Sequence, residues 1–121
     1  MTLAKDFLRA LRLRKQMCRI AEDIMGGYDA VIAPTSGSTA HPIDEPVPVR
    51  RPWAFKDIMG ALGTGAGLPS QSVPNGFSKE GLTTGIQFMG RAYDENKVIS
   101  IAKMYQERTS WHLRHPEMFK P

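Results

Sequence analysis

The chain has 121 residues, with 16 Lys and Arg against 12 Asp and Glu, 11 glycines, 9 prolines and one cysteine. This length suits one domain or part of one, and a single cysteine excludes both an internal disulfide framework and a zinc site built on cysteines. No window approaches the roughly 18 consecutive apolar residues of a transmembrane helix, and residues 1–15 lack the apolar core of a signal peptide. We therefore expect a cytoplasmic protein with no membrane partner.

Residues 3–25 have the pattern of one long helix. Apolar side chains recur every three or four residues, no Gly or Pro interrupts them, and Gly26-Gly27 ends the run. Six of the first 19 residues are Lys or Arg, and Asp6 is the only acidic residue among them. This basic stretch could meet the phosphates of a nucleic acid. Because no aromatic interleaving or nucleic-acid motif accompanies it, a solvated or partner-facing helix surface is favoured, and we expect no nucleic acid partner.

The middle of the chain alternates short apolar runs with proline and glycine. Residues 28–33 form an apolar run before Pro34, which is typical of a parallel strand buried on both faces. Five of the nine prolines lie in residues 34–52, so neither a helix nor a central strand can persist there. A loop of this length is usually functional or ordered by a partner. Residues 53–66 then predict a short helix that dissolves into the glycine-rich run 63–67.

The last third predicts a hairpin and a helix. Strands are expected over residues 70–73 and 83–89, with a turn region over residues 75–81 that begins with the strong turn dipeptide Asn75-Gly76. A final helix over residues 95–108 follows, with Tyr93 or Asp94 as its cap. Its buried stripe comprises Val98, Ile101, Ala102 and Tyr105. The tail, residues 111–116, is expected to be irregular.

Side chains that could carry chemistry do not form a complete set. His41, His112 and His115 have no acidic partners at metal-ligand spacing, and His112 and His115 are better explained as a surface pair than as ligands. The serines around positions 37 and 71 lack the Gly-x-Ser-x-Gly pattern. Glycines 60, 63, 65 and 67 fit no phosphate-loop spacing, and we expect them to let the backbone approach another segment or a substrate closely. We therefore expect no metal and no cofactor.

Three stretches resemble the C-terminal part of the amidase signature hydrolases, a family that includes bacterial amidases and one component of the tRNA-dependent amidotransferase, its A subunit. Residues 28–35, Tyr-Asp-Ala-Val-Ile-Ala-Pro-Thr, look like the family's Asp-hydrophobic-Thr-Pro-Thr strand. Residues 67–76, Gly-Leu-Pro-Ser-Gln-Ser-Val-Pro-Asn-Gly, look like its first Gly-Leu-Pro segment. Residues 81–91, Gly-Leu-Thr-Thr-Gly-Ile-Gln-Phe-Met-Gly-Arg, look like its second one. Order and spacing agree over about three-quarters of the chain.

The resemblance implies an α/β fold that is the C-terminal part of the amidase signature mixed sheet. Its expected elements are a long N-terminal helix, a central strand, a strand hairpin and a C-terminal helix. Residues 1–121 would make a single partial domain. Within it, residues 1–27 form the helix that leads in, and residues 28–121 form the amidase-like C-terminal segment.

The family's catalytic Ser–cis-Ser–Lys triad belongs to a segment further upstream, and nothing in this chain matches that segment. The resemblance therefore implies no catalytic residue here. The stretch before the first Gly-Leu-Pro resembles one that lines the acyl pocket of relatives, which implies Met59, Leu62 and Thr64 as a substrate-binding wall. Packing at a helix end is an equal alternative for these residues. Thr64 and Thr83 depart from the Asn and Pro that are common in the family.

The sequence thus predicts the C-terminal portion of an amidase-type hydrolase, which breaks carboxamide C–N bonds when the fold is complete. This portion would supply scaffold and pocket wall and would not be catalytic alone. Because uncovered helix faces and strand edges favour association, the expected partner is an upstream amidase fragment or a second copy in a homo-oligomer. A small-molecule amide would bind only the completed fold. Two alternatives stay open: a non-enzymatic interaction module or degenerate remnant that forms a homo-oligomer, and a nucleic-acid binder that rests only on the N-terminal charges.

Overall fold

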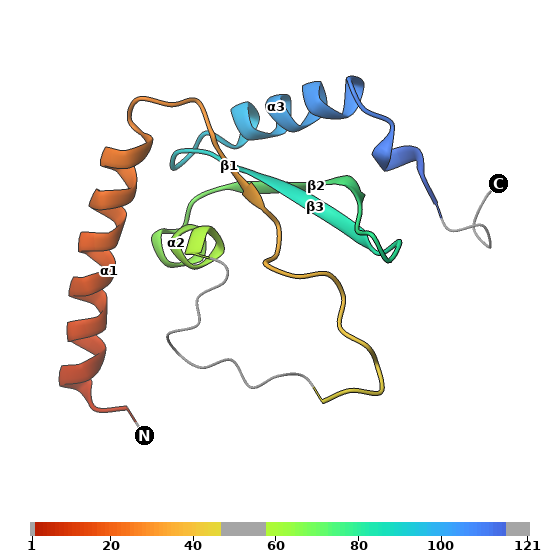
Figure 1. The fold of residues 1–121 in the computed structure, drawn as a ribbon. Coiled ribbons are helices and arrows are strands. Elements are labelled where there is room, and N and C mark those ends of the chain that lie inside the picture. The colour runs from red at the N-terminus through yellow and green to blue at the C-terminus, as the bar shows by residue number, and fades with distance from the viewer. Residues whose placement is uncertain (1, 47–57, 116–121) are drawn as a thin grey trace.

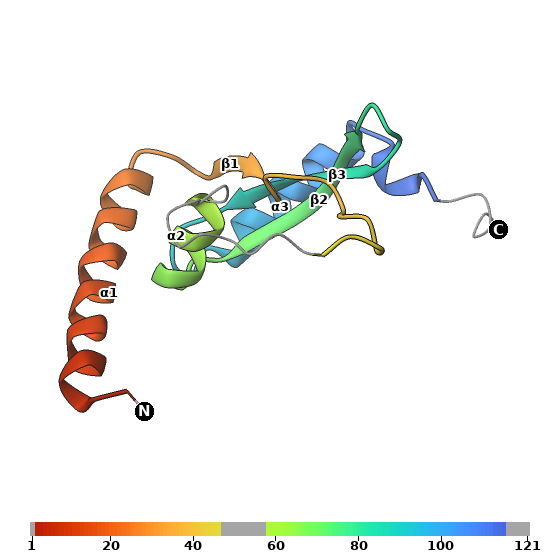
Figure 2. The same ribbon diagram turned by 60° about the horizontal axis from the view of Figure 1, so that its bottom comes forward.

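The computed structural model describes residues 2–46 and 58–115. In chain order its elements are helix α1 (Ala4–Met25), strand β1 (Val31–Pro34), helix α2 (Ile58–Ala66), strands β2 (Ser70–Phe77) and β3 (Thr83–Met89), helix α3 (Glu95–Glu107) and the 3-10 turn η1 (Trp111–Leu113). The strands form one antiparallel sheet in the order β1-β3-β2. Helix α3 covers one face of the sheet, whereas α1 and α2 pack together at one end (Figures 1 and 2). The chain is therefore α/β, as predicted.

The core lies between the hairpin and α3. Val73 of β2 and Phe88 of β3 pack against Val98 and Ala102 of α3, and the ring centroids of Phe88 and Tyr105 lie 5.7 Å apart. These residues recur at alternate positions on the strands and at four-residue spacing on the helix, so each element presents one apolar face. The predicted stripe of α3 is confirmed. Asp94 is its N-cap residue but makes no side-chain cap hydrogen bond.

Glycines allow α2 to approach both the sheet and α1. A Cβ at Gly63 would lie 2.6 Å from Met89 Cε, and one at Gly65 would overlap Met17 Cε. The expectation that these glycines serve close backbone approach is confirmed. The expectation that the helix dissolves at this run is wrong, because α2 continues to Ala66. Residues 53–57 of the predicted helix lie outside the described residues.

Side chains of α1 form hydrogen bonds with the last carbonyl groups of α2. Arg14 Nε donates a 2.9 Å hydrogen bond to the Gly65 carbonyl oxygen, and Cys18 Sγ donates one of 3.5 Å to that of Ala66. Gly67, with φ of +73°, turns the chain so that its own N–H reaches the Gly63 carbonyl oxygen at 2.8 Å. A cation beside the free carbonyls of a helix C-terminus is stabilising. One residue of the basic stretch thus has a structural role.

Strand β1 corrects the prediction of a strand buried on both faces. It pairs only with β3, in antiparallel orientation, and so forms an edge of the sheet in the described chain. Ala33 is buried, but the Ile32 side chain is 60% exposed. Ile32 is paired with Phe88 and so lies on the sheet face that α3 covers. The physical reason for its exposure is that α3 packs over β2 and β3 and does not extend over the β1 edge.

The chain reverses in the second half of the predicted turn region, not at the Asn-Gly pair with which that region begins. Asn75 and Gly76 lie inside β2, where a β-bulge between Pro74 and Gly76 absorbs an irregular register. The chain reverses instead at residues 78–82: Ser78 Oγ accepts hydrogen bonds from the N–H groups of Glu80 and Leu82, and Gly81 has φ of +79°. Because a serine hydroxyl and a left-handed glycine suffice for this turn, the strand continues through Asn-Gly.

In the described residues, none of the helices combines the length and apolar character that a bilayer crossing requires.

Candidate functional site

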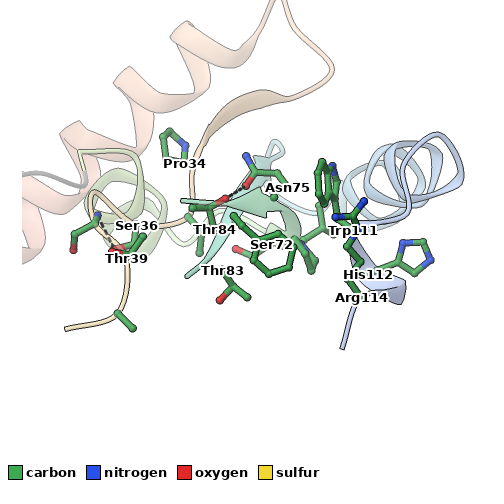
Figure 3. A pocket seen from close by; sticks show the side chains of 18 of the residues that line it. Pro34, Ser36, Thr39, Ser72, Asn75, Thr83, Thr84, Trp111, His112 and Arg114 are labelled. Carbon is green, nitrogen blue, oxygen red and sulfur yellow. Dashed lines mark hydrogen bonds between the residues drawn. The ribbon is translucent and has the colours of Figure 1, made fainter. Parts of the chain in front are cut away.

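A broad groove of about 950 Å³ lies beside the half of the hairpin that is nearer its turn. Its walls come from the loop that follows β1, from the adjoining parts of β2 and β3, and from the segment around η1 (Figure 3). These segments are far apart in the sequence. They meet because β3 pairs with both other strands and because the chain after α3 returns to β2.

Hydroxyl and amide groups dominate one wall of the groove. Thr84 Oγ1 donates a 2.8 Å hydrogen bond to Asn75 Oδ1 across the two strands (Figure 3). Thr35 lies against Gly85: its N–H donates a 2.9 Å hydrogen bond to the Gly85 carbonyl oxygen, and a Cβ at Gly85 would lie 2.7 Å from Thr35 Oγ1. The glycine therefore keeps the loop after β1 close to the sheet, where Ser36 and its neighbours line the groove.

The far end of the groove carries aromatic and cationic groups. Trp111 meets Phe77 edge-on, with ring centroids 6.1 Å apart, and the Arg114 guanidinium carbon lies 4.6 Å from the Trp111 ring. His112 also lines the groove, and its Nδ1 is the only buried side-chain nitrogen or oxygen in the described chain without a hydrogen-bond partner. A buried polar atom without a partner is destabilising. A hydrogen bond from water or a ligand to Nδ1 would relieve this cost.

The described lining of the groove offers hydrogen-bonding groups and one permanent cation, Arg114. Among the described residues its lining contains no carboxylate, and Arg114 lies at the end formed by η1 together with His112 and His115. Among the described residues, no serine hydroxyl is hydrogen-bonded to a lysine, and no group of three His, Cys, Asp or Glu side chains could hold a metal ion. The arrangement suits a ligand with carbonyl, amide or anionic groups.

The residues predicted as a substrate-binding wall lie apart from this groove. All three are on α2, where Leu62 is half-buried and Thr64 is exposed, while the side chain of Met59 lies outside the described residues. Leu62 and Thr64 are two positions apart, which on an α-helix places them on opposite sides. The structure therefore does not bring these two side chains together, and their role in substrate binding stays a prediction.

Sequence reasoning missed the groove residues of the hairpin and of η1. Asn75 belongs to the predicted turn, and Trp111 and Arg114 belong to the tail that is expected to be irregular. One signal is present: Ser70 and Ser72 alternate along β2, as Gly85 and Gln87 do along β3, so one hairpin face is small and polar. The closure of the groove by η1 has no comparable signal, because it depends on contacts between distant segments.

In the part of the chain that the structure describes, two groups outside the groove have shifted pKa values. A hydrogen bond to Asp29, helped by the charge of Asp94, raises the pKa of Lys97 above its ordinary 10.5. The Lys97 Nζ atom lies 3.1 Å from Asp29 Oδ1 and 3.6 Å from Asp94 Oδ2, which links the segment before β1 to the start of α3. A hydrogen bond with Ser78 lowers the pKa of Glu80 in the hairpin turn. Both groups stabilise local structure and do not belong to the site.

Comparisons with known proteins agree on one family. The family described as Amidase matches residues 1–99. In Brevibacillus brevis, the A subunit of glutamyl-tRNA(Gln) amidotransferase is 36% identical over 92% of this chain, and its counterpart in Thioalkalivibrio sulfidiphilus is 35% identical over 94%. The chain spans 23% of the length of each of these relatives.

Solved structures give the same result. The crystal structure of the Thermotoga maritima counterpart of these two proteins matches 86% of this chain and 23% of its own, with a TM-score of 0.72 and 33% identity. Native peptide amidase from Stenotrophomonas maltophilia matches 91% of this chain and 22% of its own, with a TM-score of 0.63 and 28% identity. The fold described above is thus similar to about a quarter of these larger structures.

Proposed function

Because the chain belongs to the amidase family, we propose that it is the C-terminal portion of an amidase-type hydrolase, which cleaves the C–N bond of a carboxamide when the fold is complete. In this proposal the portion supplies scaffold and substrate-pocket wall and does not catalyse alone. Its one cysteine, Cys18, is a free thiol, which is consistent with a reducing, cytoplasmic compartment.

The observation that carries the proposal is the open edge of β1. Among residues 2–46 and 58–115 this strand pairs with β3 alone, and Ile32 beside its other edge is 60% exposed. An edge strand with free backbone groups and an exposed apolar side chain is a template for another strand. A completing polypeptide would extend the sheet beyond β1 and cover Ile32.

The opposite edge of the sheet supports this assignment by contrast. Strand β2 carries Pro74, which has no N–H to donate, and the bulge between Pro74 and Gly76 interrupts its regular pairing. Prolines and bulges at an edge strand prevent the addition of another strand. Strand β1 also has a proline, Pro34, but it is the last residue of the strand. The proposal therefore places the added strand beside residues 31–33, where β1 has no proline and no bulge.

The completing polypeptide would bring the reacting groups. An activated serine would attack the carboxamide carbon, the nitrogen would leave with a proton relayed through the second serine and lysine, and water would then release the acyl group. From this chain, Met59, Leu62 and Thr64 of α2 are the proposed wall beside the acyl group. The groove at η1 offers polar groups that fit a carbonyl or amide, but its described lining has no serine–lysine pair.

Complementation tests the proposal directly. A truncated peptide amidase of S. maltophilia, which lacks the segment that matches this chain, is co-expressed with this chain. The truncated enzyme, this chain and the pair are each assayed for ammonia release from a peptide amide. We expect no release from either polypeptide alone, and co-purification with measurable release from the pair. Turnover by this chain alone would contradict the assignment of the reacting groups to another polypeptide.

A matched pair of substitutions locates the contact. Ile32→Lys places a charge at the open edge of β1, whereas Ile43→Lys places the same charge in the loop after β1, where Ile43 is 97% exposed. We expect Ile32→Lys to abolish co-purification and Ile43→Lys to leave it unchanged. Equal effects of the two variants would refute a role for the β1 edge.

A further inference from the structure

Five cationic side chains of α1 lie on the side of the helix that faces away from α2. Because an α-helix turns about 100° per residue, they share a sector of about 120°. This surface, which we call the α1 basic face, consists of Lys5, Arg9, Arg12, Lys15 and Arg19, all exposed. The contacts with α2 are on the opposite side, where Arg14 is hydrogen-bonded to the Gly65 carbonyl oxygen and Cys18 to that of Ala66. Helix α1 stands at the end of the molecule, so the basic face is accessible (Figures 1 and 2).

Within the described chain, no acidic side chain neutralises the α1 basic face. Between residues 5 and 19 the only acid is Asp6, which lies outside the sector, and none of the five cations has an ion-pair partner among the described residues. Protein surfaces usually intersperse charges of both signs, so a stripe of one sign is a field that attracts a partner of the opposite sign. The sequence alone favours a solvated or partner-facing surface here. The structure adds that Arg14 contacts α2, whereas the other five cations stay available to a partner.

The α1 basic face matches the phosphate backbone of a nucleic acid in length and in sign. From Lys5 to Arg19 the helix rises about 21 Å, and over this length a duplex presents about a dozen phosphates. Each cation therefore has a phosphate within reach. An acidic protein does not offer so long a run of one charge, because protein surfaces mix the two signs. A basic stripe along a helix is the electrostatic footprint of nucleic acid binding.

The position of α2 argues against a membrane as the partner of α1. A helix that lies on a bilayer buries its apolar side among the acyl chains, with the cations on its polar side. In α1 the side opposite the basic face is occupied by α2, since Met17 lies against Gly65 and Arg14 is hydrogen-bonded to it. Between residues 5 and 19 the basic sector also contains Leu8 and Gln16 but no aromatic ring. Contacts from this face therefore go to phosphates and do not read bases.

We propose that the α1 basic face binds the phosphate backbone of a double-stranded nucleic acid without reading its sequence. The face is separate from the β1 edge, so the inference does not rest on the proposed function. Each phosphate contact changes the slope of log K against log salt by about −0.9, so five contacts give a slope of about −4.5. Because counterion release supplies essentially all of non-specific affinity, we expect a dissociation constant of about 1 μM at about 50 mM salt and about 30 μM at about 100 mM.

Two pairs of lysines give a matched test by fluorescence anisotropy of a labelled DNA duplex of mixed sequence, titrated with the full chain. Lys5→Gln with Lys15→Gln removes two charges from the basic face, whereas Lys79→Gln with Lys103→Gln removes two exposed charges outside α1. We expect the first variant to weaken binding about 200-fold at about 50 mM salt and to reduce the slope to about −2.7. The second should change the constant less than about threefold, because distant charges are screened. Circular dichroism checks that both variants keep their helix content.

Three results would overturn the proposal. They are no binding of the duplex by about 100 μM chain at about 50 mM salt, equal effects of the two double variants, and an unchanged salt slope for Lys5→Gln with Lys15→Gln. Vesicles that contain phosphatidylserine provide the remaining control under the same conditions. We expect the duplex to be bound more tightly than the vesicles, and binding of the vesicles without binding of the duplex would assign the α1 basic face to a membrane instead.

Discussion

Gln87 provides a quantitative test of how the three strands are held in register on the face away from α3. It lies on the central strand β3 and is only 7% exposed. Its Nε2 donates a 3.2 Å hydrogen bond to the Pro34 carbonyl oxygen of β1, and its Oε1 accepts one of 3.2 Å from Ser70 Oγ of β2. Leucine has nearly the same volume but can make neither bond.

The expected cost of Gln87→Leu follows from these two bonds. Each contributes about 0.5–1.5 kcal/mol net, and the new buried methyl groups recover part of the loss. Ser70 and Pro34 are exposed residues whose polar atoms can turn to water, so the full penalty of a buried orphan group does not apply. We expect a loss of about 1.5 kcal/mol in the free energy of unfolding, or a fall of about 6 °C in Tm.

The assay is urea and thermal unfolding followed by circular dichroism, with Gln87→Glu as the informative companion. A carboxylate at this position keeps an acceptor for Ser70 but turns its second oxygen toward the Pro34 carbonyl oxygen. Because burial disfavours the ionised form, this variant should lose more stability at about pH 8 than at about pH 4. Unchanged stability of Gln87→Leu, together with a pH-independent effect of Gln87→Glu, would refute the bridging role.

Three further predictions concern the core, the ion pair and the groove. Val98→Ala removes two methyl groups from a side chain that is 2% exposed, so unfolding by urea should show a loss of about 2 kcal/mol. The pKa of Lys97 is raised in the folded chain, so its contribution to stability is fully present below pH 10.5 and is lost as the pH rises through the folded-state pKa. Asp29→Asn removes the main cause of this shift. The difference in Tm between the original chain and Asp29→Asn should therefore vanish in strongly alkaline solution. Arg114→Met removes the cation contact with Trp111 and should lower stability by about 0.5 kcal/mol in thermal unfolding, whereas no change would show that the stacking is not stabilising.

Regular elements with one apolar face could be predicted from the sequence. Strand β3 lies at residues 83–89, as its pattern predicts, and the predicted bounds of α1 and α3 fall within one residue of the observed ends. In α3 the spacing of Val98 and Ala102 matches the helical period, and both are buried against Phe88. For these elements the local pattern and the tertiary packing favour the same structure.

Features that depend on distant partners could not be predicted. Asn75-Gly76 is a strong turn signal, yet pairing with Thr84 and the register of β3 keep it inside β2. Strand β1 has the composition of a buried strand, but whether Ile32 is covered depends on segments that are not next to it in the sequence. The groove has the same origin, since Trp111 reaches Phe77 only after the hairpin and α3 have formed.

The exposed apolar side chains extend beyond the β1 edge, and this bears on what the completing polypeptide must cover. Helix α1 carries several of them, among them Phe7, Leu13 and Ile20 at 58%, 57% and 55% exposure. Ile32 at the open edge of β1 is 60% exposed. Because large exposed apolar surfaces mark interaction sites, the proposed completing polypeptide would have to contact α1 as well as β1.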